Sequence, residues 1–201
     1  MAQSFFRVGT TADGARTGTG TAWSTPDNIL GASVDYQWAQ CTQTVTAGDS
    51  DGLAMSNPDF SAVPALAIID GIEVRAASYI QIVAGNPVIW VDCQLILADG
   101  SDSAATDTVA GWNIWSGNYS YVTGGGPSDL WGETGLTGAD INDVDWGFWI
   151  TVNLPLIDDL ARIDQMLMKV YYTIVTITDV NTTESWTDGD TGLVITGTTF
   201  L

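Results

Sequence analysis

The stretch Asp70–Val83, which reads DGIEVRAASYIQIV, decides the fold of this chain. Apolar or small residues occupy every second position, while Glu73 and Arg75 fall on the opposite face. A period of two residues is typical of a β-strand with one buried face. Val88–Leu97 repeats the pattern, and Gly85-Asn86-Pro87 lies between the two runs. The sequence therefore predicts two half-buried strands joined as a hairpin.

Further alternating runs follow the same period and predict more short strands. They are Asp35–Ala47, Asp145–Val152, Arg162–Thr178 and Leu193–Phe200. Leu136–Asp143 is instead interpreted as a short helical turn capped by Thr137. Many short strands and no long helix favour an all-β fold of two sheets, each with one solvated face. We expect a β-sandwich, and a jelly roll rather than an immunoglobulin-type sandwich.

The length of 201 residues is consistent with a single domain. Residues 9–22 are small and polar, so residues 1–22 are predicted to form a flexible, extended N-terminal arm and residues 23–201 the sandwich domain. The alternation also predicts which side chains fill the space between the sheets. These are Ile72, Val74, Ile89, Val91, Cys93, Leu95, Phe148, Ile150, Val170 and Tyr172.

The charge of the chain excludes several classes of function. The formal net charge is −19, from 24 acidic residues against five Lys and Arg and no histidine. Five scattered cations cannot follow a nucleic-acid backbone. Histidine, the usual general base, is missing, so the residues favour a non-enzymatic protein without a cofactor. No apolar run is long enough to span a membrane and no signal peptide is recognisable, which predicts a soluble protein made in the cytoplasm of the cell that expresses it.

Acidic residues supply the few candidates for chemistry. Paired carboxylates can cleave glycosidic bonds, and the nominees are Asp158-Asp159 and the group Asp140, Asp143 and Asp145. Asp-rich loops can bind calcium, and the nominees are Asp49–Gly52, Asp99–Asp102 and Asp188–Asp190. Aspartate is also the ordinary residue of turns and caps. We therefore expect solvated loop acids, with no catalytic residue and no metal site.

Tryptophan and cysteine leave two further alternatives open. Aromatic side chains at the surface could stack on sugars. The candidates are the tryptophans that the strand pattern assigns least clearly to the core: Trp90, Trp112, Trp115, Trp131 and Trp149. Core packing or a subunit interface is the alternative that we favour. Cys41 and Cys93 lie in predicted strands and are expected to be buried free thiols rather than a disulfide.

Four segments, in this order, resemble a group of tailed-phage virion proteins. Ala22–Leu30 resembles an opening W-x-x-P-x-N-x-L motif, and Ile68–Val74 resembles an A-x-I-x-G-I-x-V strand. Trp131-Gly132 followed by Leu136–Asp143 and Phe148 resembles W-G-x-x-L-T-x-x-D-I-N-D…F-G. Arg162–Tyr172 resembles the closing strand of the group. The resemblance covers residues 22–172 and implies an all-β structural protein of the head or tail, without enzymatic activity.

The leading hypothesis is therefore a capsid decoration, or cement, protein located in the virion on the outer surface of the head. Its partner would be the shell of the major capsid protein, and shell geometry favours a homo-oligomer, with a trimer as the guess. The alternative is a tail or fibre module that binds a host-surface glycan. A carbohydrate-active enzyme is a third possibility and requires two carboxyl groups that converge in a cleft.

Overall fold

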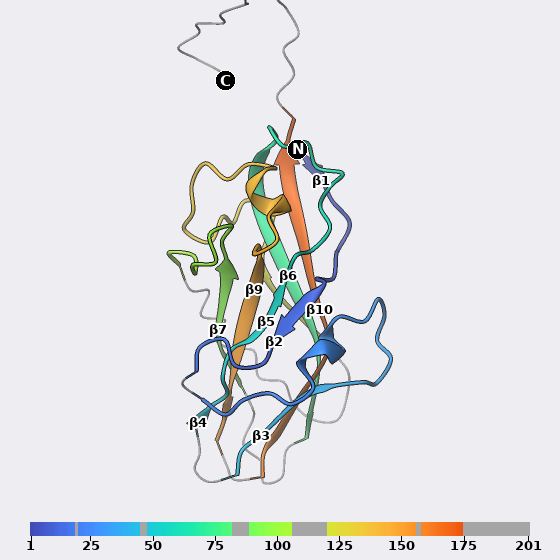
Figure 1. The fold of residues 1–201 in the computed structure, drawn as a ribbon, viewed down its shortest axis with the longest axis vertical. Coiled ribbons are helices and arrows are strands. Elements are labelled where there is room, and N and C mark those ends of the chain that lie inside the picture. Colours follow the sequence, from blue (N-terminus) through green and yellow to red (C-terminus); the bar gives the residue numbers. More distant parts are fainter. Residues whose placement is uncertain (19, 45–47, 82–88, 106–119, 156–157, 175–201) are drawn as a thin grey trace, which may run out of the picture.

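The structure is a computed structural model that describes residues 1–18, 20–44, 48–81, 89–105, 120–155 and 158–174. Two five-stranded antiparallel sheets pack face to face, as Figure 1 shows. The predicted all-β, two-sheet sandwich is confirmed. The described helices are two short 3-10 turns, η1 (Pro26–Ile29) and η2 (Asp140–Asn142). None of the described helices is long and apolar enough to cross a bilayer.

Sheet A is built on two 14-residue strands, β6 (Ile68–Gln81) and β10 (Leu160–Thr173), which pair along almost their whole length. β8 (Ser120–Gly125) pairs with the other side of β6. β1 (Ala2–Gln3) and β3 (Ala39–Thr42) pair with β10 at opposite ends of that strand. A register shift between Ile163 and Gln165 inserts Asp164 as an extra residue in β10.

Sheet B is built around β9 (Gly147–Leu154). Three strands pair with β9: β7 (Ile89–Ile96), β5 (Leu53–Ser56) and β4 (Gly48–Asp49). β2 (Thr11–Asp13) extends the sheet beyond β5.

The predicted hairpin between β6 and β7 is wrong. β6 pairs with β10 and β8 in sheet A, whereas β7 pairs with β9 in sheet B. The linking residues 82–88 lie outside the described part of the chain. Alternation identifies the buried face of a strand but not its neighbour, and these two strands present their apolar rows to the same core from opposite sheets.

The core lies between the sheets and agrees with the predicted set. Seven of the predicted residues are buried in one apolar cluster, and Tyr172 packs partly buried against it. The seven are Ile72, Val74, Cys93, Leu95, Phe148, Ile150 and Val170. The side chains of Ile89 and Val91 lie outside the described part. The predicted last strand, Leu193–Phe200, also lies outside it, and the assignment to a jelly roll stays a prediction.

The N-terminal 22 residues lie along both sheets. β1 pairs with β10, and Arg7 exchanges backbone hydrogen bonds with Met168 at 2.7 and 2.9 Å. β2 then pairs with β5 in the other sheet. The small side chains allow this close packing: a Cβ on Gly14 would lie 2.7 Å from the carbonyl oxygen of Trp23. The segment is extended, as predicted, but within this one chain it already forms a strand of each sheet.

Two local predictions need correction. The helical turn near 136–143 is present as η2, but Thr137 does not cap it; Asp140 instead accepts hydrogen bonds from the backbone N–H and the hydroxyl of Thr137, at 2.8 and 2.7 Å. Within the described residues of the predicted strand Asp35–Ala47, which end at residue 44, only Ala39–Thr42 is a strand. The N–H groups of Asp35 and Tyr36 bond the carboxylate of Asp164, which holds this part of the chain in a loop.

The packing predicts the effect of truncating a core residue. Leu95 is fully buried between the sheets, so Leu95→Ala should lower the free energy of unfolding by about 2–4 kcal/mol. The matched control is Leu66→Ala, which removes the same atoms from a residue that is 86% exposed and should change stability by less than about 0.5 kcal/mol. Denaturant unfolding measures both, and an unchanged midpoint for Leu95→Ala would contradict the inward placement of this row.

Candidate functional site

The structure does not bring the nominated carboxylate pairs into a common cleft. Asp158 is exposed whereas Asp159 is fully buried, so the two adjacent side chains point into different surroundings. Asp143 accepts the N–H of Asp145 at 3.0 Å, as in an ordinary aspartate turn. Asp140 and Asp145 line two different pockets. These observations give no support to a glycosidase pair among the nominated acids.

The Asp-rich loops that are described use their carboxylates for internal hydrogen bonds. Asp49 accepts from the side-chain amide of Asn153 at 2.7 Å, and Asp99 accepts from the backbone and hydroxyl of Ser101. Within the described part of the chain, no three His, Cys, Asp or Glu side chains are grouped so as to hold a metal ion. The third nominee, Asp188–Asp190, lies outside the described residues.

Asp51 is the most heavily bonded of these acids. Its buried Oδ1 atom accepts the N–H groups of Thr17, Gly18 and Gly52, each at 2.8 Å, and also the Thr17 hydroxyl. Burial acts to raise the pKa of Asp51, but these hydrogen bonds outweigh it and hold the pKa below its ordinary value. The carboxylate therefore ties the N-terminal segment to the turn before β5.

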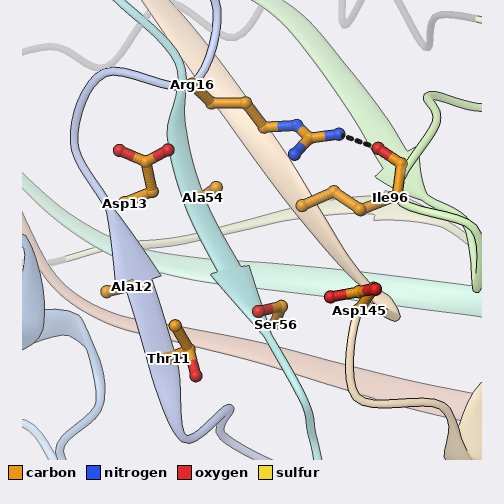
Figure 2. A pocket seen from close by; sticks show the side chains of 9 residues that line it. Thr11, Ala12, Asp13, Arg16, Ala54, Ser56, Ile96 and Asp145 are labelled. Carbon is orange, nitrogen blue, oxygen red and sulfur yellow. Dashed lines mark hydrogen bonds between the residues drawn. The ribbon is translucent and has the colours of Figure 1, made fainter.

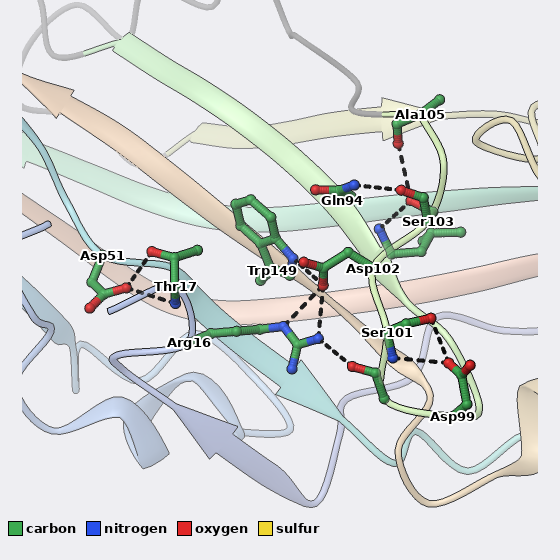
Figure 3. A network of polar contacts seen from close by, with 12 residues as sticks. Arg16, Thr17, Asp51, Gln94, Asp99, Ser101, Asp102, Ser103, Ala105 and Trp149 are labelled. Atoms are coloured by element: carbon green, nitrogen blue, oxygen red, sulfur yellow. Dashed lines mark hydrogen bonds and ion pairs between the residues drawn. The ribbon is translucent and has the colours of Figure 1, made fainter. Parts of the chain in front are cut away.

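A second link joins the N-terminal segment to the outer face of sheet B. The Arg16 guanidinium donates to Asp102 at 2.8 Å and to the carbonyl of Gly100 at 2.8 Å, while the Trp149 indole N–H donates to Asp102 at 2.9 Å (Figure 3). Trp149 packs with Ala54 and is buried beneath this ion pair. Arg16 and Asp102 thus cover an apolar patch that the sheet alone would expose.

The tryptophans that can be placed do not form a sugar platform. Trp149 is buried as described, and Trp131 lies in the main core, where its indole N–H donates to the carbonyl of Ile72 at 3.2 Å. Nothing is described of the side chains of Trp90, Trp112 and Trp115. One aromatic pair lies at the surface. Tyr36 is 65% exposed, and its ring contacts the ring of Trp38 edge to face.

Both cysteines are buried free thiols, as predicted. Cys41 lies in β3 and Cys93 in β7, so they belong to different sheets. Burial and then the charge of Asp51 raise the pKa of the Cys41 thiol to about 12. At neutral pH this thiol is protonated and unreactive.

On the outer face of sheet A, cationic side chains lie over aromatic rings. We call Phe6, Trp38, Glu73, Arg75, Arg162, Lys169 and Tyr171 the cation–aromatic face. The guanidinium of Arg75 lies 4.0 Å from the Phe6 ring centre, and the Lys169 ammonium lies 4.7 Å from the same ring. Further along β10, Arg162 lies over Trp38 at 5.5 Å. Such contacts contribute about 0.5–1 kcal/mol each at exposed sites.

Glu73 is the counter-ion at the centre of this face. Its carboxylate binds Arg75 and Lys169 at 2.7 Å each and accepts the Tyr171 hydroxyl at 2.6 Å. Burial acts to raise the pKa of Glu73, but these three partners lower it further than burial raises it. The pKa of Lys169 is raised, because its bonds to Glu73 and Tyr171 outweigh its own burial. All three charges are therefore fixed near neutral pH, with one more cation than acid.

The opposite side of the sandwich carries a small acidic pocket of about 180 Å³. Asp13 and Asp145 lie on opposite sides of it, with Ala54 and Ser56 between them (Figure 2). Arg16 lines it too, but that guanidinium is held by Gly100 and Asp102. The pocket is suited to a positively charged, partly apolar group.

One end of the sandwich exposes large apolar side chains. We call these residues the apolar end: Met1, Phe5, Leu66, Ile68 and Ile174. The N-terminus, the start of β6 and the end of β10 meet there, since Ala2 pairs with Tyr172 and Ile68 with Thr173 (Figure 1). Phe5 and Leu66 are 83% and 86% exposed. Large exposed apolar side chains at one end of a protein typically mark a contact with another molecule.

Sequence reasoning missed both the cation–aromatic face and the apolar end. The polar face of Asp70–Val83 does place Glu73 and Arg75 together, but their partner Lys169 depends on the register of β6 against β10. The apolar end combines three segments far apart in the sequence. No local pattern reveals such a combination before the strand pairing is known.

The bonding of Asp51 predicts a pH dependence. Because its pKa is lower in the folded than in the unfolded chain, its contribution is present above the unfolded value of about 3.9 and is lost as the pH falls through the folded value. Asp51→Asn should therefore cost about 1–3 kcal/mol at neutral pH. The difference from the wild type should shrink as the pH falls below about 4.

Denaturant unfolding between neutral pH and pH 3 measures this difference. Asp27→Asn is the control, since Asp27 is an exposed acid and its replacement should change stability by less than about 0.5 kcal/mol at neutral pH. Equal stability of Asp51→Asn and the wild type at neutral pH would contradict the role given to Asp51.

No family model, no curated protein and no solved structure matches this chain. Its function is therefore argued from its own residues.

Proposed function

We propose that this chain is a non-enzymatic structural protein of a phage virion, a decoration protein that braces the outer surface of the head. Its partner is the shell of the major capsid protein. The resemblance over residues 22–172 supports the virion assignment. The placement of the nominated acids supports a structural role, because those that are described serve turns and loop contacts rather than a shared cleft.

The observation that carries the proposal is the apolar end. A decoration protein works by contact, so it needs a surface whose burial is favourable and a body rigid enough to transmit that contact. Full burial of a Leu, Ile or Phe side chain contributes about 1.5–3 kcal/mol, and the apolar end offers several of these side chains together. Their sum is large enough to offset much of the cost of association.

The charge suits the same role. A net charge of −19 is repelled by packaged DNA, which favours an outward position on the head. Binding only to the assembled shell stabilises that shell by mass action. A shell lattice provides symmetry axes at which three copies can meet, which is the reason for proposing a trimer.

One observation favours the alternative, a tail or fibre module that binds a host-surface glycan. Tyr36 is exposed beside Trp38, and the face of an exposed aromatic ring can stack on a sugar. Both functions use a surface contact, so binding experiments separate them.

The proposal predicts that the purified full-length chain binds shells that lack it. Replacing Phe5 and Leu66 by Asp should lower the affinity at least about tenfold, because two charges would be buried in an apolar contact. The matched control is Tyr36→Asp, which introduces a charge at an exposed aromatic residue away from the apolar end and should leave shell binding unchanged.

Co-sedimentation with bare shells measures the affinity, and a glycan array measures the alternative. A wild-type chain that fails to bind shells would overturn the decoration proposal. Loss of shell binding in Tyr36→Asp but not in the Phe5 and Leu66 variant would overturn the role of the apolar end. Glycan binding that Tyr36→Asp abolishes, without shell binding, would establish the tail module.

A further inference from the structure

The two sides of the sandwich differ in charge. The described strands of sheet A carry as many cations as acids, with Arg75, Arg162 and Lys169 against Asp70, Glu73 and Asp164. The described strands of sheet B carry three acids, Asp13, Asp49 and Asp92, and no cation. Because the whole chain has 24 acids and five cations, sheet A is the side on which another acidic surface meets the least repulsion.

We infer that a second copy of this chain docks head to tail, with the cation–aromatic face of one copy on the acidic pocket of the next. Arg75 of one copy enters the pocket between Asp13 and Asp145 of its neighbour. The contact goes beyond binding to a shell and does not depend on it, since both surfaces belong to this chain.

The side chain of Arg75 is already held in position for such a contact. The Phe6 ring supports its guanidinium at 4.0 Å, and Glu73 binds it through Nε and one terminal nitrogen. The side chain remains 37% exposed. A guanidinium held in this way loses little conformational entropy when it binds a carboxylate, and arginine–carboxylate hydrogen bonds are among the strongest at protein surfaces.

The pocket is the complementary surface. Its two flanking carboxylates, Asp13 and Asp145, are both exposed, and Ala12, Ala54 and Ile96 line it with apolar atoms that can contact the stem of an arginine. Its volume of about 180 Å³ is small, which suits a single side-chain head rather than a whole peptide segment.

The arrangement has a consequence for assembly. The two surfaces belong to opposite sheets, so the contact is heterologous, and a pair of copies keeps one free cation–aromatic face and one free pocket. Copies therefore add one after another, until a ring closes or a row forms. A symmetric dimer through a single surface would instead stop at two copies.

The experiment measures the mass of the full-length chain by analytical ultracentrifugation across a concentration series. The wild type should form species larger than a dimer. Arg75→Gln removes the charge from the face, and Asp13→Asn/Asp145→Asn removes both charges from the pocket; each should weaken association at least about tenfold. The control for the pocket variant is Asp27→Asn/Asp158→Asn, which makes the same charge change at two exposed acids and should associate like the wild type.

A mixture of the two defective variants gives the decisive result. The intact face of the pocket variant should bind the intact pocket of Arg75→Gln, and both remaining surfaces are then defective, so growth should stop at the dimer. Thermal unfolding confirms that each variant is folded. A wild-type chain that stays monomeric, unchanged association in either variant, or a mixture that forms no dimer would each overturn the inference.

Discussion

The structure depends on the hydrogen bonds that tie residues 2–24 into both sheets. Met168 and Val170 of sheet A bind the first part of this segment, and Ser56 and Asp49 of sheet B and Gly52, which directly precedes β5, bind its later part. Apart from Trp23, which is buried in the core, the segment is rich in Gly, Ala and Thr and offers few large apolar side chains. Its stability instead comes from satisfied backbone groups and from close approach that larger side chains would prevent. Phe6 and Arg16 then cover one outer face each.

This arrangement also explains how so acidic a chain folds. Asp51 and Asp164 are buried, yet each accepts backbone N–H groups from a loop far away in the sequence. Such bonds offset the cost of burying a carboxylate, and at Asp51 they hold the pKa below its ordinary value. Glu73 is buried in the same manner among two cations and a hydroxyl. Buried aspartates therefore anchor loops by accepting their backbone N–H groups. The acids that remain exposed give the protein surface its negative charge.

Much of the fold could be predicted from the sequence, because period-two alternation reports burial directly. It identified the buried row of β6 and the core residues Leu95 and Phe148. It could not identify strand neighbours, so the β6–β7 hairpin was wrong. The candidate surfaces could not be predicted for the same reason: Lys169 binds Glu73, and Asp13 and Asp145 flank one pocket, only after the sheets have formed. The N-terminal segment was predicted to be a flexible, extended arm because its side chains are small and polar. In the structure its backbone pairs with strands of both sheets.

Amide hydrogen exchange of the monomeric chain, measured at low protein concentration by nuclear magnetic resonance, tests the central claim most directly. The amides of Arg7, Thr10, Arg16, Thr17 and Trp23 donate to groups of the same chain. We expect their exchange to be slowed by orders of magnitude, while the amide of Ser33, for which the structure shows no acceptor, exchanges rapidly. Exchange of the five amides at the rates of an unfolded peptide would contradict it and restore a free arm.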